Sequence, residues 1–206
     1  MNSQKTITEL HKAFNMLNQA FYDNALPTPY IVIYETAKKS AYGWFTPSKV
    51  WQDADGNDVM HEIALSAEYM NRDYVDVIGT LHHEMIHLYC HTNGIKDTTA
   101  SGRYHNKNFK NESEARGFYY PEDFTPDKVI GWSQSRLTDE TKELIKSFQL
   151  DEAAFALARV IPQKKAASKS NSQSKYICPD CFESFRAKKN LNVMCGDCNV
   201  AYEEEC

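Results

Sequence analysis

The chain has 206 residues and a mass of 23.6 kDa, enough for one medium domain with a small appendage or for two small domains. Hydrophobic residues make up 42% and charged residues 25%, with only 8 Gly and 7 Pro, which excludes collagen-like, disordered and coiled-coil classes. No stretch approaches the roughly 20 consecutive apolar residues that cross a bilayer, so we expect no membrane partner. The first residues carry no secretory signal pattern, which predicts a cytoplasmic protein.

The net charge of −5 is unevenly distributed along the chain. Residues 1–162 carry 16 basic and 22 acidic side chains, a net charge of −6. Residues 163–206 carry seven basic and six acidic side chains, a net charge of +1. Within that tail, residues 163–190 hold all seven basic side chains and only two acidic ones. The main part of the chain is therefore acidic, and the tail contains a basic segment.

A change in composition predicts the domain boundaries. Residues 162–175 are rich in Ser, Lys and Gln and lack large apolar side chains, so they cannot bury surface to offset the entropy of ordering. We interpret this segment as a flexible linker. The main domain is then expected at residues 1–161, and a separate C-terminal domain at residues 176–206.

Periodic patterns predict the elements of an α+β main domain. Residues 6–22 carry apolar side chains at helical spacing, and Thr6 and Glu9 have the register of a capping box at the start of that helix. Later strands are indicated by β-branched and aromatic runs, and later helices by a return to helical spacing. In chain order we expect strands at 30–34 and 41–45, a hairpin turn at Asp55-Gly56, a strand at 61–66, helices at 73–92 and 106–117, a strand at 127–134, a helix from Thr138 to about Phe148, and a last helix after Asp151.

The residues His83, Glu84 and His87 spell the pattern HExxH inside the helix predicted at 73–92. Two histidines four residues apart lie on one helix face about one turn apart, so both imidazoles can bind one ion. Glu84, beside the first of them, projects toward the water that such an ion activates. The alternative is a pair of surface histidines without a function. The pattern predicts a zinc site with Glu84 as the catalytic base.

A catalytic zinc needs a third protein ligand, and the residues alone leave its identity open. His91 lies on the same helix face but eight residues from His83, about 12 Å along the axis, which is too far for one tetrahedral site. Candidates that follow in the sequence are His105, Glu112 and Glu114. A second helix packed on the first could present any of them.

The segments LHHEMIHLYC and GRYHNKNFK, separated by a Gly-containing loop, resemble the SprT-like metalloprotease family. The similarity extends in element order over roughly residues 6–160 and implies a zincin-like metalloprotease domain. Phe109 matches a packing residue of the family, whereas Asn106 stands where many relatives have Gly. The resemblance also implies substrates that are bound or crosslinked to DNA, as in DNA–protein crosslink repair. It implies Glu84 as the catalytic residue and His83, His87 and His105 as the ligands of the catalytic zinc.

Four of the six cysteines form two CxxC pairs in the tail, with thirteen residues between the pairs: Cys178, Cys181, Cys195 and Cys198. Thiolates at this spacing converge on one tetrahedral zinc, which stabilises a unit too small to have a sufficient core. Two disulfides or a redox pair are the alternatives, and a cytoplasmic location argues against both. The pattern also resembles the zinc ribbon of bacterial SprT members. We therefore expect one structural zinc in addition to the catalytic one.

Two functions remain open at this point. The first is a zinc endopeptidase that cleaves protein substrates and reaches DNA through its linker and ribbon. The alternative is a non-catalytic nucleic-acid-binding or adaptor protein that uses the ribbon, although an intact HExxH argues against it. The candidate phosphate contacts are the basic residues of the tail: Lys164, Lys165, Lys169, Lys175, Arg186, Lys188 and Lys189.

The substrate is expected to bind along a strand close to the metal. In sites of this kind an extended peptide commonly pairs with an exposed strand, and the strand predicted at 61–66 directly precedes the HExxH helix. His61 in this strand is expected at the surface rather than at the metal. Tyr104, beside His105, is a candidate oxyanion donor, with packing in the core as the alternative.

Overall fold

The computed structural model describes residues 3–35, 41–99, 101–156, 159 and 173–205. The chain divides into two compact units, residues 1–161 and residues 162–206. The described part of the first unit contains four α-helices and small sheets, so the predicted α+β class is confirmed.

The first helix, α1 (Ser3–Tyr22), buries the apolar stripe that the sequence predicts, with Leu10, Phe14 and Leu17 fully enclosed. The predicted capping box is wrong because α1 already includes Ser3, three residues before Thr6. The Thr6 hydroxyl instead donates to the carbonyl of Ala154 at 2.6 Å. The Glu9 carboxylate accepts from the backbone N–H of Asp151, so both side chains tie the C-terminal part of the unit to α1.

A three-stranded sheet follows α1, with strands β1 (Tyr30–Tyr34), β2 (Gly43–Gln52) and β3 (Asp58–Ser66). The predicted hairpin turn joins β2 to β3, and Gly56 has the positive φ of +83° that favours glycine. The strand order is β1-β3-β2, with β1 parallel and β2 antiparallel to β3. Since β3 has a neighbour on both sides, the expectation that residues 61–66 offer an exposed edge to a substrate is wrong.

The helix α2 (Tyr74–Thr92) carries the HExxH pattern. The Asp73 side chain accepts from the backbone N–H of Val75 and so caps the first turn. The helix ends before Gly94, which has φ +67°, and the N–H of Ile95 reaches back to the carbonyl of Cys90 at 2.8 Å. A long apolar stripe of α2 is fully buried, which fixes the rotation of the helix about its axis.

The remaining elements of the first unit are short. They are η1 (Ala67–Tyr69), β4 (Thr98–Thr99) paired with β5 (Tyr104–His105), α3 (Lys107–Glu114), β6 (Phe118–Tyr119) paired with β7 (Arg136–Leu137), α4 (Asp139–Ser147) and η2 (Glu152–Phe155). Thr138 caps α4 as predicted. The last helix predicted after Asp151 is a single 3-10 turn as far as residue 155, and much of its remaining sequence lies outside the described residues.

The strand predicted at 127–134 is wrong. In its place a tight loop is closed by two hydrogen bonds between the backbones of Asp127 and Gly131, at 3.1 and 2.9 Å. The Asp127 carboxylate also accepts from the N–H groups of Val129 and Ile130. Because that side chain takes the N–H groups that a sheet would need, the segment turns instead of extending.

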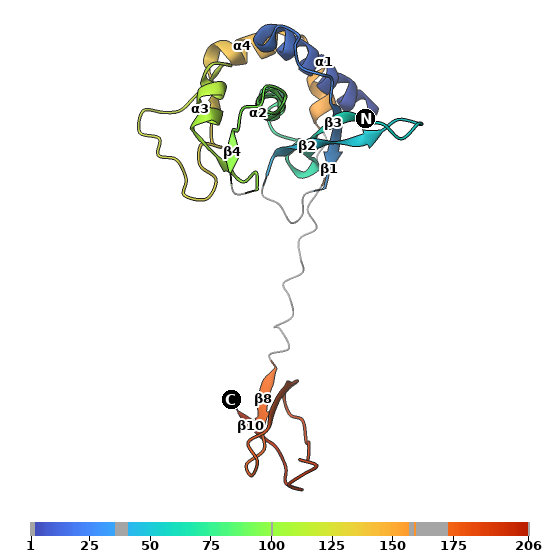
Figure 1. Ribbon diagram of the computed structural model, residues 1–206, viewed down its shortest axis with the longest axis vertical. Coiled ribbons are helices and arrows are strands. Elements are labelled where there is room, and N and C mark those ends of the chain that lie inside the picture. Colours follow the sequence, from blue (N-terminus) through green and yellow to red (C-terminus); the bar gives the residue numbers. More distant parts are fainter. Residues whose placement is uncertain (1–2, 36–40, 100, 157–158, 160–172, 206) are drawn as a thin grey trace. The chain divides into compact units, whose positions relative to one another are not determined.

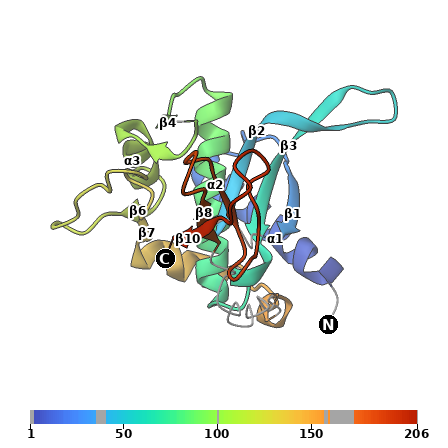
Figure 2. The ribbon, with the colours of Figure 1, turned by 90° about the horizontal axis from the view of Figure 1, so that it is seen from below.

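The first unit is built around α2 (Figure 1). In that view α2 is seen nearly end-on, with α1, α3 and α4 around it and the sheet on its other side. Figure 2 shows α2 running beside β2 and β3, whose hairpin extends beyond the other elements. The HExxH turns of α2 therefore lie between β2 and the β4–β5 segment. No helix in the described part of the chain combines the length and apolar character that a bilayer crossing requires.

The second unit is a small sheet of β8 (Ser174–Ile177), β9 (Ser184–Ala187) and β10 (Glu203–Glu205), in the order β10-β8-β9. Its strand β8 begins inside the segment predicted as linker. Tyr176 is fully buried and stacks on Phe185, with ring centroids 5.3 Å apart. One buried aromatic side chain is a small core for such a unit, so another source of stability is needed.

Candidate metal-binding sites

Three imidazoles from two separate segments meet beside α2 and form what we name the three-histidine site: His83, His87 and His105. His83 and His87 lie one turn apart on α2, and His105 ends β5. The Nε2 atom of His105 is 3.3 Å from that of His83 and 3.0 Å from that of His87. Zn–N bonds of about 2.0–2.1 Å in a tetrahedral site separate two donors by roughly 3.3–3.4 Å, so these separations fit zinc.

The protonation of these imidazoles also fits a cation. The Nδ1 atom of His87 is 2.5 Å from the Asp97 carboxylate, and that of His105 is 3.2 Å from the carbonyl of Ile130. Both partners are acceptors, so each Nδ1 carries a proton, and in the neutral form of each ring Nε2 is then the atom with the lone pair. Two lone pairs 3.0 Å apart cannot bond to each other, and a metal ion between them would satisfy both. Burial holds the pKa of His83 well below its usual value and lowers that of His105 to about 4, which keeps both rings neutral.

The backbone around His105 is held on both sides by the loop that replaces the predicted strand. The N–H of His105 donates to the carbonyl of Ile130 at 3.1 Å, and its carbonyl accepts from Trp132 at 3.0 Å. Gly131 between them has φ +63°, and a Cβ there would lie 2.1 Å from the carbonyl oxygen of His105. Only glycine allows this approach. The loop therefore fixes the position of the third imidazole.

Two neighbours of His105 in the sequence support the site. Phe109 is fully buried, and its ring centroid lies 4.6–4.7 Å from those of all three histidines, so it packs beneath the site. Asn106 caps α3 by accepting from the N–H groups of Asn108 and Phe109. Its amide also donates to the carbonyl of Lys96 at 2.8 Å. The asparagine that departs from the family pattern thus has a structural role as a helix cap.

Glu84 is buried beside the three-histidine site, with 5% of its surface exposed. Burial raises the pKa of its carboxyl to about 7, and a hydrogen bond from the backbone N–H of Phe45 in β2 opposes this shift. A carboxyl with a pKa near neutrality can both accept and return a proton. The same hydrogen bond fixes the carboxylate relative to β2.

The other candidates for the metal lie elsewhere. Glu114 pairs with Lys110 within α3, and Glu112 pairs with Arg116, which follows the end of that helix, so both carboxylates are occupied by cations of the same segment. His91 contacts His61, with ring centroids 5.1 Å apart. His61 is 8% exposed, so the expectation that it lies at the surface is wrong.

His82 is a fully buried histidine beside the first residue of the HExxH pattern. Its ring packs on those of Phe21 and Phe118, with centroids 4.7 and 5.0 Å away. Burial lowers the pKa of this imidazole to about 3, so the ring is neutral at physiological pH. It belongs to the hydrophobic core and not to the three-histidine site.

Sequence reasoning missed three groups around the site. They are the Asp97 carboxylate, the carbonyl of Ile130 and the N–H of Phe45. A histidine ligand usually donates its second N–H to a carboxylate or a carbonyl, so a search for an acidic residue shortly after the helix could have found Asp97. The two backbone groups leave no signal in the sequence.

The second unit contains the four-cysteine site: Cys178, Cys181, Cys195 and Cys198. The Sγ atoms of Cys181 and Cys195 are 3.8 Å apart, which matches the roughly 3.8 Å between thiolates on a tetrahedral zinc with Zn–S bonds of about 2.3 Å. Backbone N–H groups of Cys198 and Asp197 lower the pKa of the Cys195 thiol to about 7, which favours the thiolate that a metal requires. All four thiols are free, so the described residues show no disulfide here.

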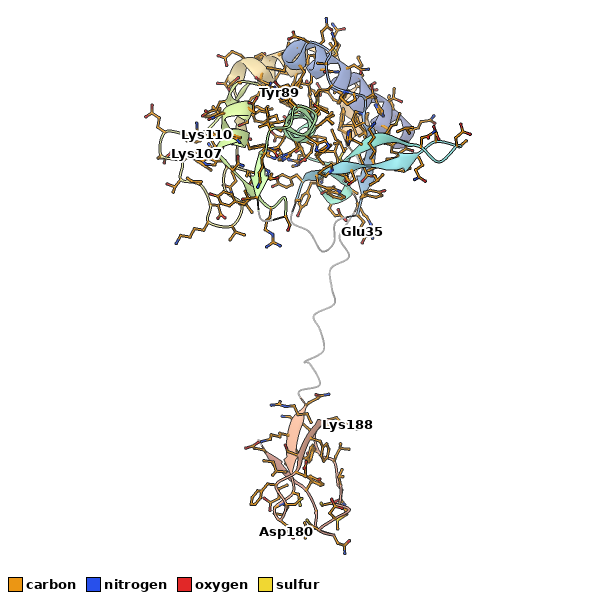
Figure 3. All side chains as sticks on the ribbon, viewed as in Figure 1. Glu35, Tyr89, Lys107, Lys110, Asp180 and Lys188 are labelled. Carbon is orange, nitrogen blue, oxygen red and sulfur yellow. The ribbon has the colours of Figure 1, made fainter. Side chains whose placement is uncertain are left out.

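The basic residues proposed for nucleic acid are only partly described. Lys164, Lys165 and Lys169 lie outside the described residues. Lys175 pairs with the carboxylate of Glu205 at 3.2 Å and lies opposite Arg186 in the β8–β9 register. Figure 3 shows Lys188 and Asp180 at opposite ends of the second unit.

Comparison with known proteins places the first unit in a family. A family model described as the SprT-like family matches residues 10–123, which is more than half of the 206 residues. The chain belongs to the SprT-like family. The family is generally metalloprotease-like, and the matched segment of this SprT-like protein contains Glu84 and the whole three-histidine site. No curated protein and no solved structure was found to match the chain.

Proposed function

We propose that this SprT-like protein is a zinc-dependent endopeptidase. The observation that carries the proposal is the convergence of three imidazoles on one point, beside the buried carboxyl of Glu84, which follows His83 in α2. Three protein ligands leave a fourth position of a tetrahedral zinc open, which is the arrangement of catalytic rather than structural sites. In this proposal His83, His87 and His105 hold the catalytic zinc.

In the proposed reaction, the metal and the residues of the chain have separate roles. When bound, zinc would supply Lewis-acid activation of a water molecule and of the scissile carbonyl. Glu84 accepts the proton of the attacking water and delivers it to the leaving amine, for which a pKa of about 7 is suited. The N–H of Phe45 holds the carboxylate in place. Asp97 and the carbonyl of Ile130 keep His87 and His105 in the tautomers that bind a metal.

An extended substrate fits beside β2. This strand is an edge of its sheet, because the order is β1-β3-β2, and its residue Phe45 contacts Glu84 through the backbone. Backbone groups on the free side of an edge strand can pair with a peptide in β-conformation. We infer that protein substrates bind along β2, in place of the residues 61–66 expected from the sequence.

Removal of zinc tests the peptidase proposal. Hydrolysis of unfolded casein should be lost after treatment with a chelator and should return when zinc is added. The His105→Ala variant should not recover at the same zinc concentration, because it lacks one ligand. The Cys178→Ser variant should recover, although it should bind one zinc fewer than the wild type. Hydrolysis that persists in fully metal-free protein would refute the proposal.

We further propose that the substrates of this peptidase are DNA-associated or DNA-crosslinked proteins. Its support is the family resemblance, the four-cysteine site and the described basic residues Arg186, Lys188 and Lys189. Together with Lys164, Lys165, Lys169 and Lys175, they could neutralise phosphates. We also propose a cytoplasmic location, where free thiols remain reduced.

Addition of DNA tests this finer proposal. Hydrolysis of a DNA-binding protein by the full chain should increase with added DNA, and a chain that lacks residues 163–206 should lose the increase. The stimulation should also decrease with rising salt concentration, because phosphate contacts release counterions. An equal rate with and without DNA in both proteins would contradict it.

A further inference from the structure

A second group of histidines lies where α2 meets β2 and β3. His61 is in β3, and His91 is in the last turn of α2, one turn beyond His87. The ring centroids of His61 and His91 are 5.1 Å apart, and the ring of Phe45 lies 5.7 Å from each of them. Within the three-histidine site the corresponding separations between imidazoles are 4.9–5.2 Å. The His61 and His91 rings are therefore spaced like a pair of ligands of one ion.

His61 is a buried imidazole with one nitrogen that has no partner. The side chain is 8% exposed, and its Nδ1 atom is enclosed and forms no hydrogen bond with any described residue. The carbonyl of Pro47 in β2 accepts a hydrogen bond from this ring, and since Nδ1 has no partner, the donor is Nε2. Burial lowers the pKa of the imidazole, so the ring is neutral and Nδ1 carries a lone pair. A buried lone pair without a donor is unfavourable, and a metal ion would satisfy it.

The contacts of His61 follow the pattern of a metal ligand. Histidine ligands commonly donate their second N–H to a carbonyl or a carboxylate, which orients the ring and leaves the other nitrogen for the metal. His105 has this arrangement, because its Nδ1 atom faces the carbonyl of Ile130 at 3.2 Å. In His61 the carbonyl of Pro47 has the same role, with the two ring nitrogens exchanged.

His91 provides the second imidazole, and its side chain is free to turn. It is exposed, its ring contacts those of His61 and Phe45, and it forms no hydrogen bond or ion pair within the described part of the chain. An exposed side chain changes rotamer easily, so His91 can direct a nitrogen toward an ion next to His61. The buried ring of His61 is fixed, and His91 closes the site over it.

We propose that His61 and His91 form a further metal site in the first unit, for a divalent transition-metal ion such as Zn²⁺. Imidazole nitrogen is a suitable ligand for Zn²⁺, Cu²⁺ and Ni²⁺. Two protein ligands leave the remaining positions to water, so this site binds zinc more weakly than the three-histidine site. The nearby charge of Lys49 in β2 also opposes a cation. The bound ion joins α2 to β3, and the site does not depend on the proposed peptidase function.

A zinc titration of the full chain tests this site. The protein is saturated with zinc, gel filtration removes the weakly bound ions, and further Zn²⁺ is added in a calorimeter. The wild type should bind one additional zinc ion. The His61→Ala and His91→Ala variants should each bind that ion at least about tenfold more weakly. Because His91 is exposed, its replacement leaves the core intact even if His61→Ala impairs folding. The Lys49→Gln variant should bind the additional ion more tightly than the wild type.

Two further variants and a second measurement complete the test. His11→Ala, in α1, removes a histidine that belongs to neither group and should keep the additional ion. His105→Ala should lose the catalytic zinc and still bind the additional ion, so this site can fail or hold independently of the peptidase proposal. In thermal unfolding, added Zn²⁺ should raise the Tm of His11→Ala but not that of His91→Ala. No additional zinc in the wild type, or equal binding of it by wild type and His91→Ala, would overturn the inference.

Discussion

Replacement of Glu84 by Gln is expected to reduce peptide hydrolysis by about 10²- to 10⁴-fold, the range that a positioned general base contributes. Gln has nearly the same shape and can still accept the N–H of Phe45, but it cannot take a proton from water. The three imidazoles are unchanged, so the variant should bind as much zinc as the wild type. Initial rates on a quenched fluorescent peptide, measured together with the zinc content, give the comparison.

The Glu114→Gln variant is the matched control. Glu114 forms an exposed pair with Lys110 on α3 and contacts none of the three histidines. Its loss should change stability by less than about 1 kcal/mol and leave the rate unchanged. Should Glu84→Gln with full zinc cleave as fast as the wild type, Glu84 is not the base and the non-catalytic adaptor function becomes the better proposal.

Replacement of Gly131 by Ala is expected to empty the catalytic zinc site while the four-cysteine site stays filled. The added Cβ would lie 2.1 Å from the carbonyl oxygen of His105 and 3.0 Å from the ring of Tyr104, so the loop must move and take His105 with it. Displacement of one ligand or its support typically lowers metal affinity at least 10- to 100-fold. Metal analysis should find about one zinc per chain in place of two, and hydrolysis should fall in parallel.

Gly94→Ala separates this effect from general backbone strain. Gly94 has a similar φ of +67°, but an added Cβ would meet no atom within 4 Å. This variant should lose about 1 kcal/mol of stability and keep both zinc ions. If Gly131→Ala also binds two zinc ions with wild-type affinity, the loop does not position His105 as inferred.

Local signals predicted the elements that depend on neighbouring residues. The hairpin turn at Gly56 and the start of α4 at Thr138 are each determined within a few residues of chain, and the sequence predicts both. The position of β3 between β1 and β2 depends on a parallel pairing with a strand about thirty residues earlier. Hydrophobic periodicity cannot reveal such a pairing, so the sequence wrongly predicts residues 61–66, in β3, as the exposed edge.

The sequence did not predict the loop at residues 127–134 or the role of Asp97, for two different reasons. Val129 and Ile130 look like a strand, but the preceding Asp127 side chain binds their N–H groups and Val129 is 58% exposed. A competing side-chain contact thus overrode β-propensity. Asp97 faces His87 only because the chain reverses after Gly94, a consequence of tertiary structure that spacing does not show.

The C-terminal end of the first unit is held by contacts with residues of its N-terminal half. The backbone N–H of Arg159 donates to the carbonyl of Ala67 at 2.9 Å, and its guanidinium pairs with Glu35 and Glu68. Thr6 holds Ala154 a few residues earlier. A shortened chain that keeps the proposed catalytic centre should therefore extend to Arg159. The C-terminal boundary of such a chain is determined by the ion pairs of Arg159 and not by the end of a helix.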